Sequence, residues 1–441
     1  MYPIAQAGLL KEKVAEEEKS KRIKIPELLL PAGSPEKMKT AFLFGADAVY
    51  CGVPRYSLRA RENEFRLESL KEAVAFTRSL GKKIYFTINA IPRNSKLPNF
   101  PKYLDEMAAM SPDAFIMADP GLILVARERT PEIDIHISVQ TNTMNYAAVK
   151  FWEKIGAKRV ILSREVSIRE AGEIKNEVPS MELEVFVHGS ICIAHSGRCF
   201  MSNYFAKRDA NQGACNNACR DKYQVVVKNL RQNDEFMEIE EDENGTYLMN
   251  SKDLRAIEFL KEISEAGIDS IKVEGRTKND YYVAIVAKSY RNALDDIKEE
   301  KSFDRGLLKE LEKVASRKYF SGFLTYGMED RVTSEEMDFQ NHEEGVSGNQ
   351  NQVYLGRVIF FDKKGQSIQI EIKNKVQIGD TVEVFFPSER NTKTFQVSEI
   401  YHKNVLKDVL SGGMGEIRLK VPFEIPENSF LSILKNSNIE K

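Results

Sequence analysis

Between residues 28 and 275 the chain alternates regularly between short apolar runs, rich in β-branched residues, and longer amphipathic segments. The runs span residues 28–32, 48–52, 84–89, 114–119, 135–140, 159–163, 183–189, 246–250 and 270–275. Apolar strands that alternate with helices are typical of a parallel sheet covered by helices on its outer face. Eight strand–helix units close a TIM-like (β/α) barrel. Because the chain has nine runs, we expect the run at 246–250 to lie outside the barrel.

The segments between the runs carry helix start and stop signals. After the first run, Ser34 is placed as an N-cap, Pro35 occupies the first helical position and Gly45 marks the end of the helix. An open doubly wound sheet is the alternative α/β architecture. No G-x-G-x-x-G motif follows any run, however, which removes the commonest cofactor site of that fold.

Polar side chains cluster directly after the runs, at the expected carboxyl ends of the strands. They are Asn89, Asp119, Gln140, Thr141, Arg164, Glu165, His188, Glu274 and Arg276. In a barrel these positions meet on one face, where the loops between strands and helices build the active site. The pattern therefore favours an enzyme over a passive scaffold.

The chain is predicted to divide into three parts. Residues 1–25 form a charged tail or short helix, and residues 26–345 form the barrel domain, with a cysteine-rich loop at 188–222. Residues 350–437 contain short alternating strands with tight turns, which predicts a small C-terminal antiparallel β-barrel. Such a module binds nucleic acid or merely packs and mediates association, and no stripe of aromatic residues decides between these roles.

Composition excludes several classes of protein. The chain has no run of about 18 apolar residues that could span a bilayer. Its formal net charge of −2 gives the whole molecule no electrostatic footprint for nucleic acid, so any RNA contact must be local. The N-terminus does not read as a secretory signal, and five cysteines are too few for a disulfide framework. We therefore expect a cytoplasmic protein with reduced thiols and no membrane contact.

Four of the five cysteines lie in one loop, at Cys192, Cys199, Cys215 and Cys219. Four thiolates within 28 residues can converge on one metal ion or cluster. A structural zinc ion usually takes ligands from paired short knuckles, whereas a four-iron cluster tolerates irregular spacing. The spacing favours the cluster and leaves zinc as the alternative.

Two histidines, His188 and His195, lie beside these cysteines. A third interpretation pairs one of them, as the base, with Cys192 or Cys199 as the nucleophile of a protease. That interpretation leaves the other cysteines unexplained. Each histidine also has a structural alternative, His188 as a partner of a neighbouring backbone group and His195 as an exposed loop residue. Cys51 is expected to be a small buried hydrophobe.

The sequence EVFVHGSICIAHSGRCFMS at residues 184–202 closely resembles the defining motif of the U32 family, the collagenase-like peptidases. Further segments are similar to the branch of that family that hydroxylates tRNA. They are PRYSLRARENEF, MADPGL, VILSRE, RDANQGACNNACR, GTYLMNSKDLRAI and KVEGRTKNDYY. The resemblance runs from about residue 26 to the end of the chain and is weaker in the C-terminal domain. Residues 220–244 form a shorter segment than in relatives, which puts any contact made by the longer insertion in doubt.

The resemblance implies a TIM-like barrel that carries a [4Fe–4S] cluster on Cys192, Cys199, Cys215 and Cys219. It also implies oxygen-independent hydroxylation of the wobble uridine of certain tRNAs to 5-hydroxyuridine, with prephenate as cosubstrate. Other branches of the family hydroxylate ribosomal RNA or a quinone ring. A U32-type protease and a zinc-stabilised RNA-binding module remain the competing functions, although the chain shows no complete proteolytic triad.

Prephenate carries two carboxylates, so its pocket should contain guanidinium or ammonium groups. The candidates are Arg59, Arg61, Arg164, Lys272 and Arg276, with Arg59 and Arg276 preferred. In the alternative interpretation these cations form salt bridges with carboxylates of the barrel rim such as Glu165 and Glu274.

The cysteine-rich loop is locally basic. Its cations Lys207, Arg208 and Arg220 are predicted to dock the anticodon backbone, and the alternative is an ordinary solvated loop. A cluster in this loop would lie at the barrel mouth beside His188 and His195. Either histidine is then a candidate for proton transfer to or from an extruded base.

Overall fold

The computed structural model describes most of the chain. The described residues are 23–58, 63–191, 195–197, 227–228, 236–237, 252–314, 316–328 and 352–434. The run at 246–250 and nearly all of the predicted N-terminal tail lie outside these ranges.

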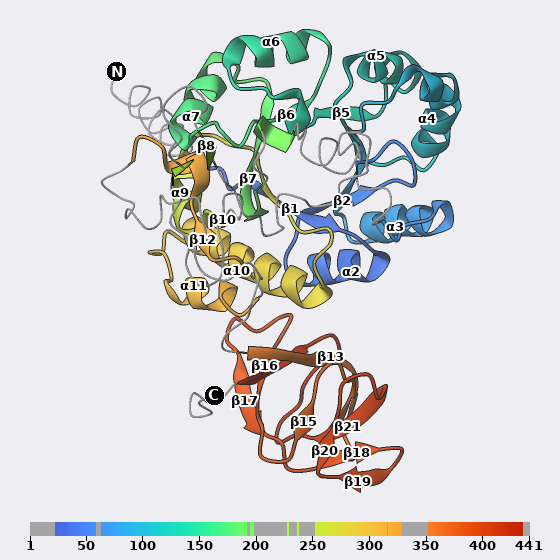
Figure 1. The fold of residues 1–441 in the computed structure, drawn as a ribbon, viewed down its shortest axis with the longest axis vertical. Coiled ribbons are helices and arrows are strands. Elements are labelled where there is room, and N and C mark those ends of the chain that lie inside the picture. Colours follow the sequence, from blue (N-terminus) through green and yellow to red (C-terminus); the bar gives the residue numbers. More distant parts are fainter. Residues whose placement is uncertain are drawn as a thin grey trace, which may run out of the picture.

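Eight parallel strands close into a barrel (Figure 1). They are β1 (Glu27–Ala32), β2 (Ala48–Gly52), β3 (Lys83–Ile88), β4 (Ala114–Met117), β5 (Asp134–Ile137), β6 (Arg159–Ile161), β7 (Glu182–Ser190) and β11 (Ser270–Val273). The strands pair in sequence order, and β11 pairs with both β7 and β1, which closes the ring. The TIM-like fold expected from the alternation of apolar runs is confirmed.

Helices cover the outside of the barrel. They are α2 (Pro35–Leu43), α3 (Leu67–Ser79), α4 (Phe100–Ala108), α5 (Pro120–Arg129), α6 (Tyr146–Lys154), α7 (Ile168–Glu177), α9 (Leu260–Glu265), α10 (Asp280–Lys298) and α11 (Gly306–Leu311). The described 3₁₀ turns are η2 (Asn94–Asn99), η3 (Val139–Thr141), η4 (His195–Gly197), η7 (Ile257–Phe259) and η8 (Gly322–Thr325). Helix α2 begins as predicted, because the Ser34 hydroxyl accepts a hydrogen bond from the Lys37 amide and Pro35 opens the helix. Gly45 follows its end with φ of +111°, a conformation that favours glycine.

Two short strands extend the barrel wall beyond β7. Strand β10 (Asp253–Arg255) pairs antiparallel with the end of β7, and β12 (Tyr319–Phe320) pairs with β10. The pairing of β7 with β11 shifts register between Lys272 and Val273, which leaves Val187 as a bulge. After this bulge the side chains of β7 point to the opposite faces of the strand, just as the cysteine-rich loop begins.

A buried network of ion pairs fills the end of the barrel at which several strands begin. The Arg159 guanidinium, only 3% exposed, binds Glu27 at 2.7 Å, Glu182 at 2.8 Å and Glu184 at 3.1 Å. Lys272 binds the other carboxylate oxygen of Glu184 at 2.9 Å. Buried charges are tolerated only when they are paired in this way. The network plugs this end, so ligands can be expected at the opposite, carboxyl end.

The C-terminal domain is an eight-stranded antiparallel sheet that curves into a half-barrel. Its strands are β13 (Gln352–Asp362), β14 (Ser367–Glu371), β16 (Thr381–Phe385), β17 (Lys393–Gln396), β18 (Ile400–His402), β19 (Val405–Lys407), β21 (Glu416–Lys420) and β22 (Phe430–Leu434). The same domain contains the pair of β15 (Val376–Gln377) with β20 (Val409–Leu410). Outside it, β8 (Val227–Lys228) pairs with β9 (Phe236–Met237) in the part of the chain between β7 and β10.

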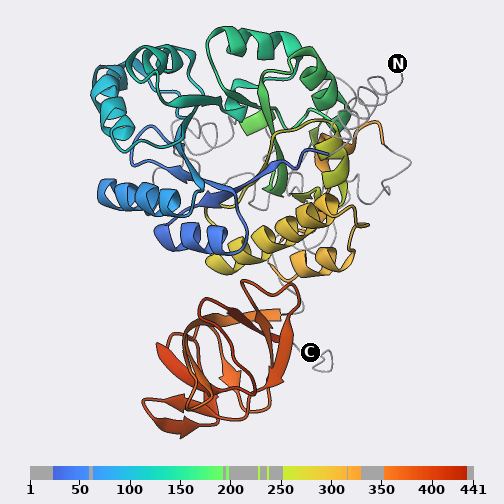
Figure 2. The same ribbon diagram turned by 180° about the vertical axis from the view of Figure 1, so that it is seen from behind.

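The C-terminal domain packs against the outer helices of the barrel and not against its mouth (Figure 2). The Phe44 ring, just after α2, stacks on Phe385 of β16 with centroids 5.5 Å apart and contacts Phe430 of β22. The Arg390 guanidinium donates two hydrogen bonds, of 2.7 and 2.6 Å, to the carboxylate of Asp296 in α10. Aromatic packing and a bidentate ion pair thus join the two domains.

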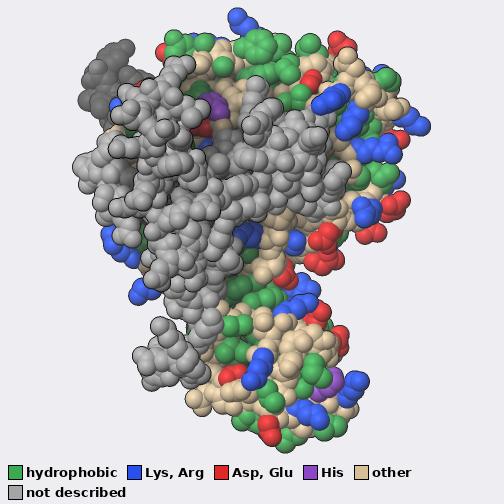
Figure 3. Space-filling model, viewed as in Figure 1, with side chains coloured by type: hydrophobic (Ala, Val, Ile, Leu, Met, Phe, Trp, Pro, Cys, Tyr) green, Lys and Arg blue, Asp and Glu red, His purple; other side chains and the backbone are tan. Residues whose placement is uncertain are grey.

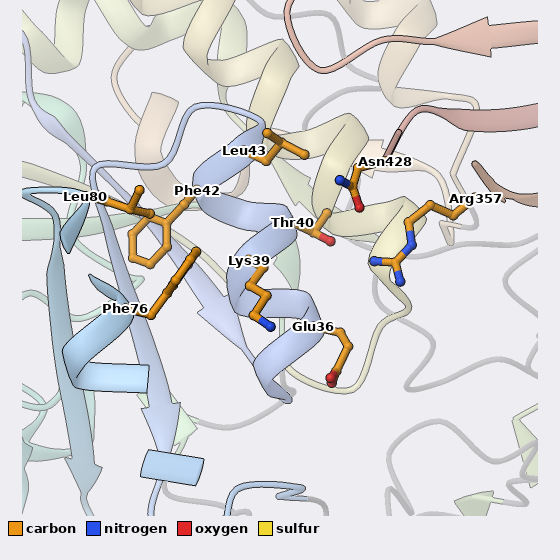
Figure 4. A pocket seen from close by; sticks show the side chains of 9 residues that line it. All are labelled: Glu36, Lys39, Thr40, Phe42, Leu43, Phe76, Leu80, Arg357 and Asn428. Carbon is orange, nitrogen blue, oxygen red and sulfur yellow. The ribbon is translucent and has the colours of Figure 1, made fainter. Parts of the chain in front are cut away.

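A groove of about 670 Å³ opens beside this contact, between α2, α3 and the C-terminal domain. Phe42, Phe76 and Leu80 line one side of it, while Arg357 and Asn428 come from the C-terminal domain (Figure 4). None of the predicted site residues lines this groove.

Within the part of the chain that the structure describes, no helix combines the length and apolarity needed to cross a membrane.

Candidate active site at the barrel mouth

The described site residues separate into two groups. Arg164, His195 and Arg276 lie in loops at the carboxyl ends of the strands, whereas Lys272 and His188 lie within β11 and β7. The remaining predicted residues are Arg59, Arg61, Cys192, Cys199, Lys207, Arg208, Cys215, Arg220 and Cys219, and all of them lie outside the described residues. The geometry of the mouth is therefore built from the first group and its neighbours.

Arg276 reaches from the end of β11 across the mouth to β2 and β3. Its guanidinium donates to the Thr87 hydroxyl at 3.1 Å and lies 3.5 Å from the Ser57 hydroxyl. The guanidinium carbon is 5.8 Å from the centroid of the Tyr50 ring, within the range of a cation–π contact. The side chain is half-buried. A guanidinium group is suited to bind the carboxylate of an anionic ligand with two parallel hydrogen bonds.

Two glycines leave the space that this arginine occupies. A Cβ atom added to Gly52, the last residue of β2, would lie 3.1 Å from the Arg276 Nη1 atom and 3.1 Å from the Asn63 side chain. A Cβ atom added to Gly33 would lie 2.2 Å from the Arg276 carbonyl oxygen. A larger residue at Gly33 would displace the Arg276 backbone, and one at Gly52 would crowd the guanidinium group. The two glycines therefore define the shape of this side of the mouth.

Arg164 follows β6 and lies over the ring of Phe186 on β7, with 3.9 Å between the guanidinium carbon and the ring centroid. Among the residues that the structure describes, it forms no ion pair. Its backbone amide donates to the Ser196 hydroxyl at 3.1 Å. The stacking leaves the guanidinium edge available for hydrogen bonds, as in many carboxylate-binding sites.

Lys272 differs from the other cations because it lies inside the barrel. It is 4% exposed, binds Glu184, and lies 4.5 Å above the Tyr50 ring. Burial lowers the pKa of Lys272, and the neighbouring Glu184 carboxylate opposes that shift. The salt-bridge interpretation holds for this residue, but its partner is Glu184. The partners considered from the sequence have other contacts. Glu165 accepts hydrogen bonds from Ser196, and Glu274 lies 3.2 Å from the Tyr50 hydroxyl.

His188 is enclosed between the barrel wall and α10. Its ring contacts Tyr282 and Tyr290 of α10 and Tyr319 of β12, with centroids 5.4 to 5.9 Å apart. The Tyr290 hydroxyl donates to the Val187 carbonyl and lies 3.3 Å from His188 Nδ1. Burial lowers the pKa of His188 to about 3, so the ring is neutral at physiological pH. This placement favours the structural interpretation of His188 over a role in proton transfer.

His195 is exposed and is held by Asn142, the residue that follows η3. The Asn142 amide nitrogen lies 2.7 Å from His195 Nδ1 and 2.9 Å from the His195 carbonyl oxygen. Because a carbonyl oxygen only accepts, the Asn142 atom must be the donating amide group. It then donates to Nδ1 as well, which places the proton of the neutral imidazole on Nε2.

Glu165 holds the next residue of the same turn. Its carboxylate accepts a hydrogen bond from the Ser196 backbone amide at 2.8 Å and another from the Ser196 hydroxyl. Ser196 is 1% exposed and has φ of +42°, a conformation that costs energy for a residue other than glycine. Asn142 and Glu165 thus fix residues 195–197 against the loops that follow β5 and β6.

Sequence reasoning missed the roles of Asn142, Thr87 and Tyr50. Asn142 follows the polar pair Gln140 and Thr141, but its own φ of +54° is a property of the folded turn. Thr87 and Tyr50 lie within apolar runs, where they read as ordinary strand residues. The sequence signal that could have identified them is their position in the carboxyl-terminal parts of neighbouring strands.

Comparisons with known proteins match most of the chain. Residues 33–334 match the family described as Peptidase family U32, and residues 350–431 match the Peptidase family U32 C-terminal domain. The chain is 41% identical to tRNA hydroxylation protein P of Escherichia coli (strain K12), over 93% of this chain and 97% of that protein. It is 43% identical to tRNA hydroxylation protein P of Haemophilus influenzae, over 94% of this chain and 97% of that protein.

A third relative is tRNA hydroxylation protein P1 of Bacillus subtilis, which is 36% identical over 83% of this chain and 85% of that protein. These similarities extend through both the barrel and the C-terminal domain. The chain belongs to peptidase family U32.

Proposed function

We propose that this protein is a tRNA hydroxylase. The observation that carries the proposal is the identity of 41 and 43% to proteins named tRNA hydroxylation protein P, over more than nine-tenths of both chains. A barrel mouth lined by half-buried arginines and a positioned histidine is chemically suited to an enzyme of this kind. In finer detail, we propose oxygen-independent hydroxylation of the wobble uridine to 5-hydroxyuridine, with prephenate as cosubstrate.

The cofactor belongs to the same proposal. Cys192, Cys199, Cys215 and Cys219 supply four thiolates, the donor set of a [4Fe–4S] cluster, and zinc is the alternative metal. When bound, such a cluster supplies one-electron redox chemistry. Residues 195–197 lie between the first two of these cysteines in sequence, and Asn142 and Glu165 hold that segment at the mouth. This attachment supports a site for the metal beside the barrel opening.

Two arginines are suited to the two carboxylates of prephenate. Arg276 is held by the hydroxyl groups of Thr87 and Ser57, and Arg164 is stacked on Phe186. These contacts restrain both guanidinium groups, so little side-chain entropy is lost when a carboxylate binds. Arg59 and Arg61 stay candidates for the same role. Lys272 contributes less because Glu184 already neutralises it.

His195 is the proposed proton-transfer group of the mouth. The hydrogen bond from Asn142 to Nδ1 leaves the proton of the neutral ring on Nε2, where it can be donated. His188 is enclosed by three tyrosines, and its pKa of about 3 makes it a poor acid or base near neutral pH. Of the two candidates, His195 is therefore the one that we retain.

A peptidase activity, which the family's description suggests, is the second candidate. A thiol protease needs a thiolate beside a base. Cys51, the described cysteine, is fully buried, and burial raises the pKa of its thiol to about 12. A nucleophile would therefore have to come from the cysteine-rich loop. Cleavage of gelatin or collagen by the purified protein, abolished by a Cys192→Ala substitution, would favour this candidate.

Two measurements test the proposed function. Nucleoside mass spectrometry of tRNA should show 5-hydroxyuridine in the parent strain and its loss in a deletion strain without a paralogue. Undiminished 5-hydroxyuridine in that strain would reject the function.

Anaerobic purification followed by iron, sulfide and zinc analysis tests the cofactor. A coloured protein that bleaches when any one of the four cysteines is replaced supports the cluster, whereas colourless protein with bound zinc contradicts it.

A further inference from the structure

Two neighbouring loops of the barrel mouth carry an exposed group of cations. Arg55 lies between β2 and α3, while Arg93, Lys96 and Lys102 lie between β3 and the first turn of α4. All four side chains are exposed. We call these four residues the cationic rim. They are distinct from Arg276 and Arg164, whose half-buried side chains lie in other loops of the mouth.

Tyrosine contacts join the two loops into one surface. The Tyr56 hydroxyl donates to the Lys96 carbonyl at 2.7 Å, and the Tyr56 ring packs edge-on against Phe100 at 5.1 Å. The Tyr103 hydroxyl lies 3.2 Å from both the backbone amide and the carbonyl oxygen of Arg55. These bonds hold the backbones of the cationic rim in a fixed relation, although the cations come from segments about 40 residues apart.

The rim is also stiff. Pro92, Pro98 and Pro101 fix backbone dihedral angles within the β3–α4 segment, and residues 94–99 form the 3₁₀ turn η2. A preorganised surface loses little conformational entropy when it binds a partner. The rim is therefore suited to a partner that contacts it with a regular, rigid surface.

The ion pairs of the described residues show how far carboxylates neutralise this surface. Within the described ranges, none of the four cations forms an ion pair. The nearby Asp105 of α4 is already bound by two hydrogen bonds from Arg129, at 3.1 and 2.6 Å. Figure 3 shows several Lys and Arg side chains on the side of the barrel where α4 lies, with Asp and Glu side chains toward α3. The rim thus presents net positive charge although the whole chain carries a formal charge of −2.

We propose that the cationic rim docks the sugar–phosphate backbone of the RNA substrate. The inference rests on the proposed function, which brings a tRNA to the barrel mouth. Unpaired, exposed Lys and Arg side chains bind phosphates chiefly by releasing counterions, and such contacts orient a nucleic acid without reading its sequence. The rim would hold the RNA strand that flanks the modified nucleotide, while Arg276 and Arg164 face the cosubstrate.

The test compares a rim variant with a matched control. The rim variant carries Arg93→Ala and Lys96→Ala. The control carries Arg305→Ala and Lys309→Ala, which remove one exposed Arg and one exposed Lys at α11, on the opposite side of the barrel (Figure 1). Binding of a full-length tRNA transcript is measured by fluorescence anisotropy between about 50 and 200 mM salt. Circular dichroism verifies that both variants are folded.

The rim variant should bind the transcript about tenfold more weakly at low salt. The slope of log affinity against log salt should fall by about 1.5, since each lost phosphate contact contributes roughly 0.7 to 0.9. The control should keep both values. In the hydroxylation assay the rim variant should raise KM and leave kcat unchanged, because backbone contacts bind substrate and transition state equally.

The outcomes separate the two proposals. If the unmodified protein binds no tRNA, the proposed function fails and the docking surface fails with it. If the unmodified protein binds tRNA and the rim variant keeps the same affinity and salt slope, only the docking proposal is overturned. Equal weakening by the control variant would also overturn it, because the effect would then reflect net charge and not this surface.

Discussion

At the scale of single residues, two hydrogen-bonding side chains decide how the cysteine-rich loop begins. Glu165 holds the Ser196 amide and hydroxyl, and Asn142 holds the ring and carbonyl of His195. Neither residue is a candidate metal ligand. They act through the backbone of residues 195–197, which lies between Cys192 and Cys199 in sequence. In metal sites generally, replacing a residue that orients the ligands lowers metal affinity about 10- to 100-fold.

Replacing Glu165 tests this role. In Glu165→Ala the Ser196 amide loses its acceptor while Ser196 keeps an unfavourable φ of +42°, so we expect local opening of the turn. Hydrogen exchange at the Ser196 amide should accelerate about tenfold or more, and anaerobically purified protein should retain less iron. Glu165→Gln keeps one acceptor oxygen and should restore most of both properties. Glu173→Ala removes an exposed carboxylate from the following helix, α7, and should change neither.

His188 gives a pH-dependent prediction. Its folded pKa of about 3 lies below the ordinary value near 6.5, so the unfolded chain binds more protons in that interval. The contribution of His188 to the free energy of unfolding is therefore fully present above about pH 6.5. It falls as the pH drops toward 3, by up to about 1.4 kcal/mol per pH unit. His188→Gln should flatten this dependence of the free energy of unfolding. Urea titrations at pH 7, 6 and 5 measure it, and parallel curves for the two proteins would contradict the assignment.

At the scale of elements, the end of β7 decides where the cysteine-rich loop leaves the barrel. A bulge at Val187 turns His188 toward α10, and Gly189 follows with φ of +102°. A Cβ atom added to Gly189 would lie 2.3 Å from the Glu274 carbonyl oxygen. Strands β7 and β11 thus approach each other at their carboxyl ends more closely than any side chain would permit.

Gly189→Ala should therefore destabilise the protein by more than the backbone strain alone, which is about 1 to 3 kcal/mol. Gly81→Ala is the matched control, because Gly81 also has positive φ, +64°, but nothing lies within 4 Å of its added Cβ atom. Chemical denaturation of both variants isolates the steric cost of the β7–β11 approach. Equal losses of unfolding free energy in the two variants would show that the close approach has no energetic consequence.

At the scale of the whole molecule, the C-terminal half-barrel is joined to the outer helices through Phe44 and the Arg390–Asp296 pair. The Arg390 guanidinium, hydrogen-bonded to Asp296, lowers the pKa of that carboxyl. The mouth lies on another side of the barrel, so the C-terminal domain contributes no residue to the described part of the site. Its contact serves to hold the two domains in one orientation.

Phe44→Ala should loosen this contact. Loss of a buried aromatic side chain costs about 3 to 5 kcal/mol, and here most of that cost falls on the contact between domains. We expect the single denaturation transition to separate into two and limited proteolysis to release the C-terminal domain. Leu43→Ala, which truncates the adjacent and half-exposed side chain, should leave one transition. A single transition in both variants would contradict the proposed coupling.

The candidate site was only partly predictable from the sequence. The positions of Arg164 and Arg276 follow from the rule that polar residues after parallel strands meet at one face of a barrel. The partner of Lys272 did not follow from it, because Glu184 is 88 residues away and faces it only after β7 and β11 are paired in register. The environment of His188 depends on a bulge, which shifts the facing of a strand without leaving a signal in its apolar pattern.

The sequence alone determined the barrel architecture and its family. Both follow from local features, namely the spacing of the apolar runs and the short motifs. Each segment carries these features whatever other segments it contacts in the fold. The tertiary structure alone decided which polar side chains face one another. Those contacts depend on strand register, on close backbone approach at Gly52 and Gly189, and on loops joined across the mouth by Tyr56. Such distances between remote segments exist only after the ring of strands has closed.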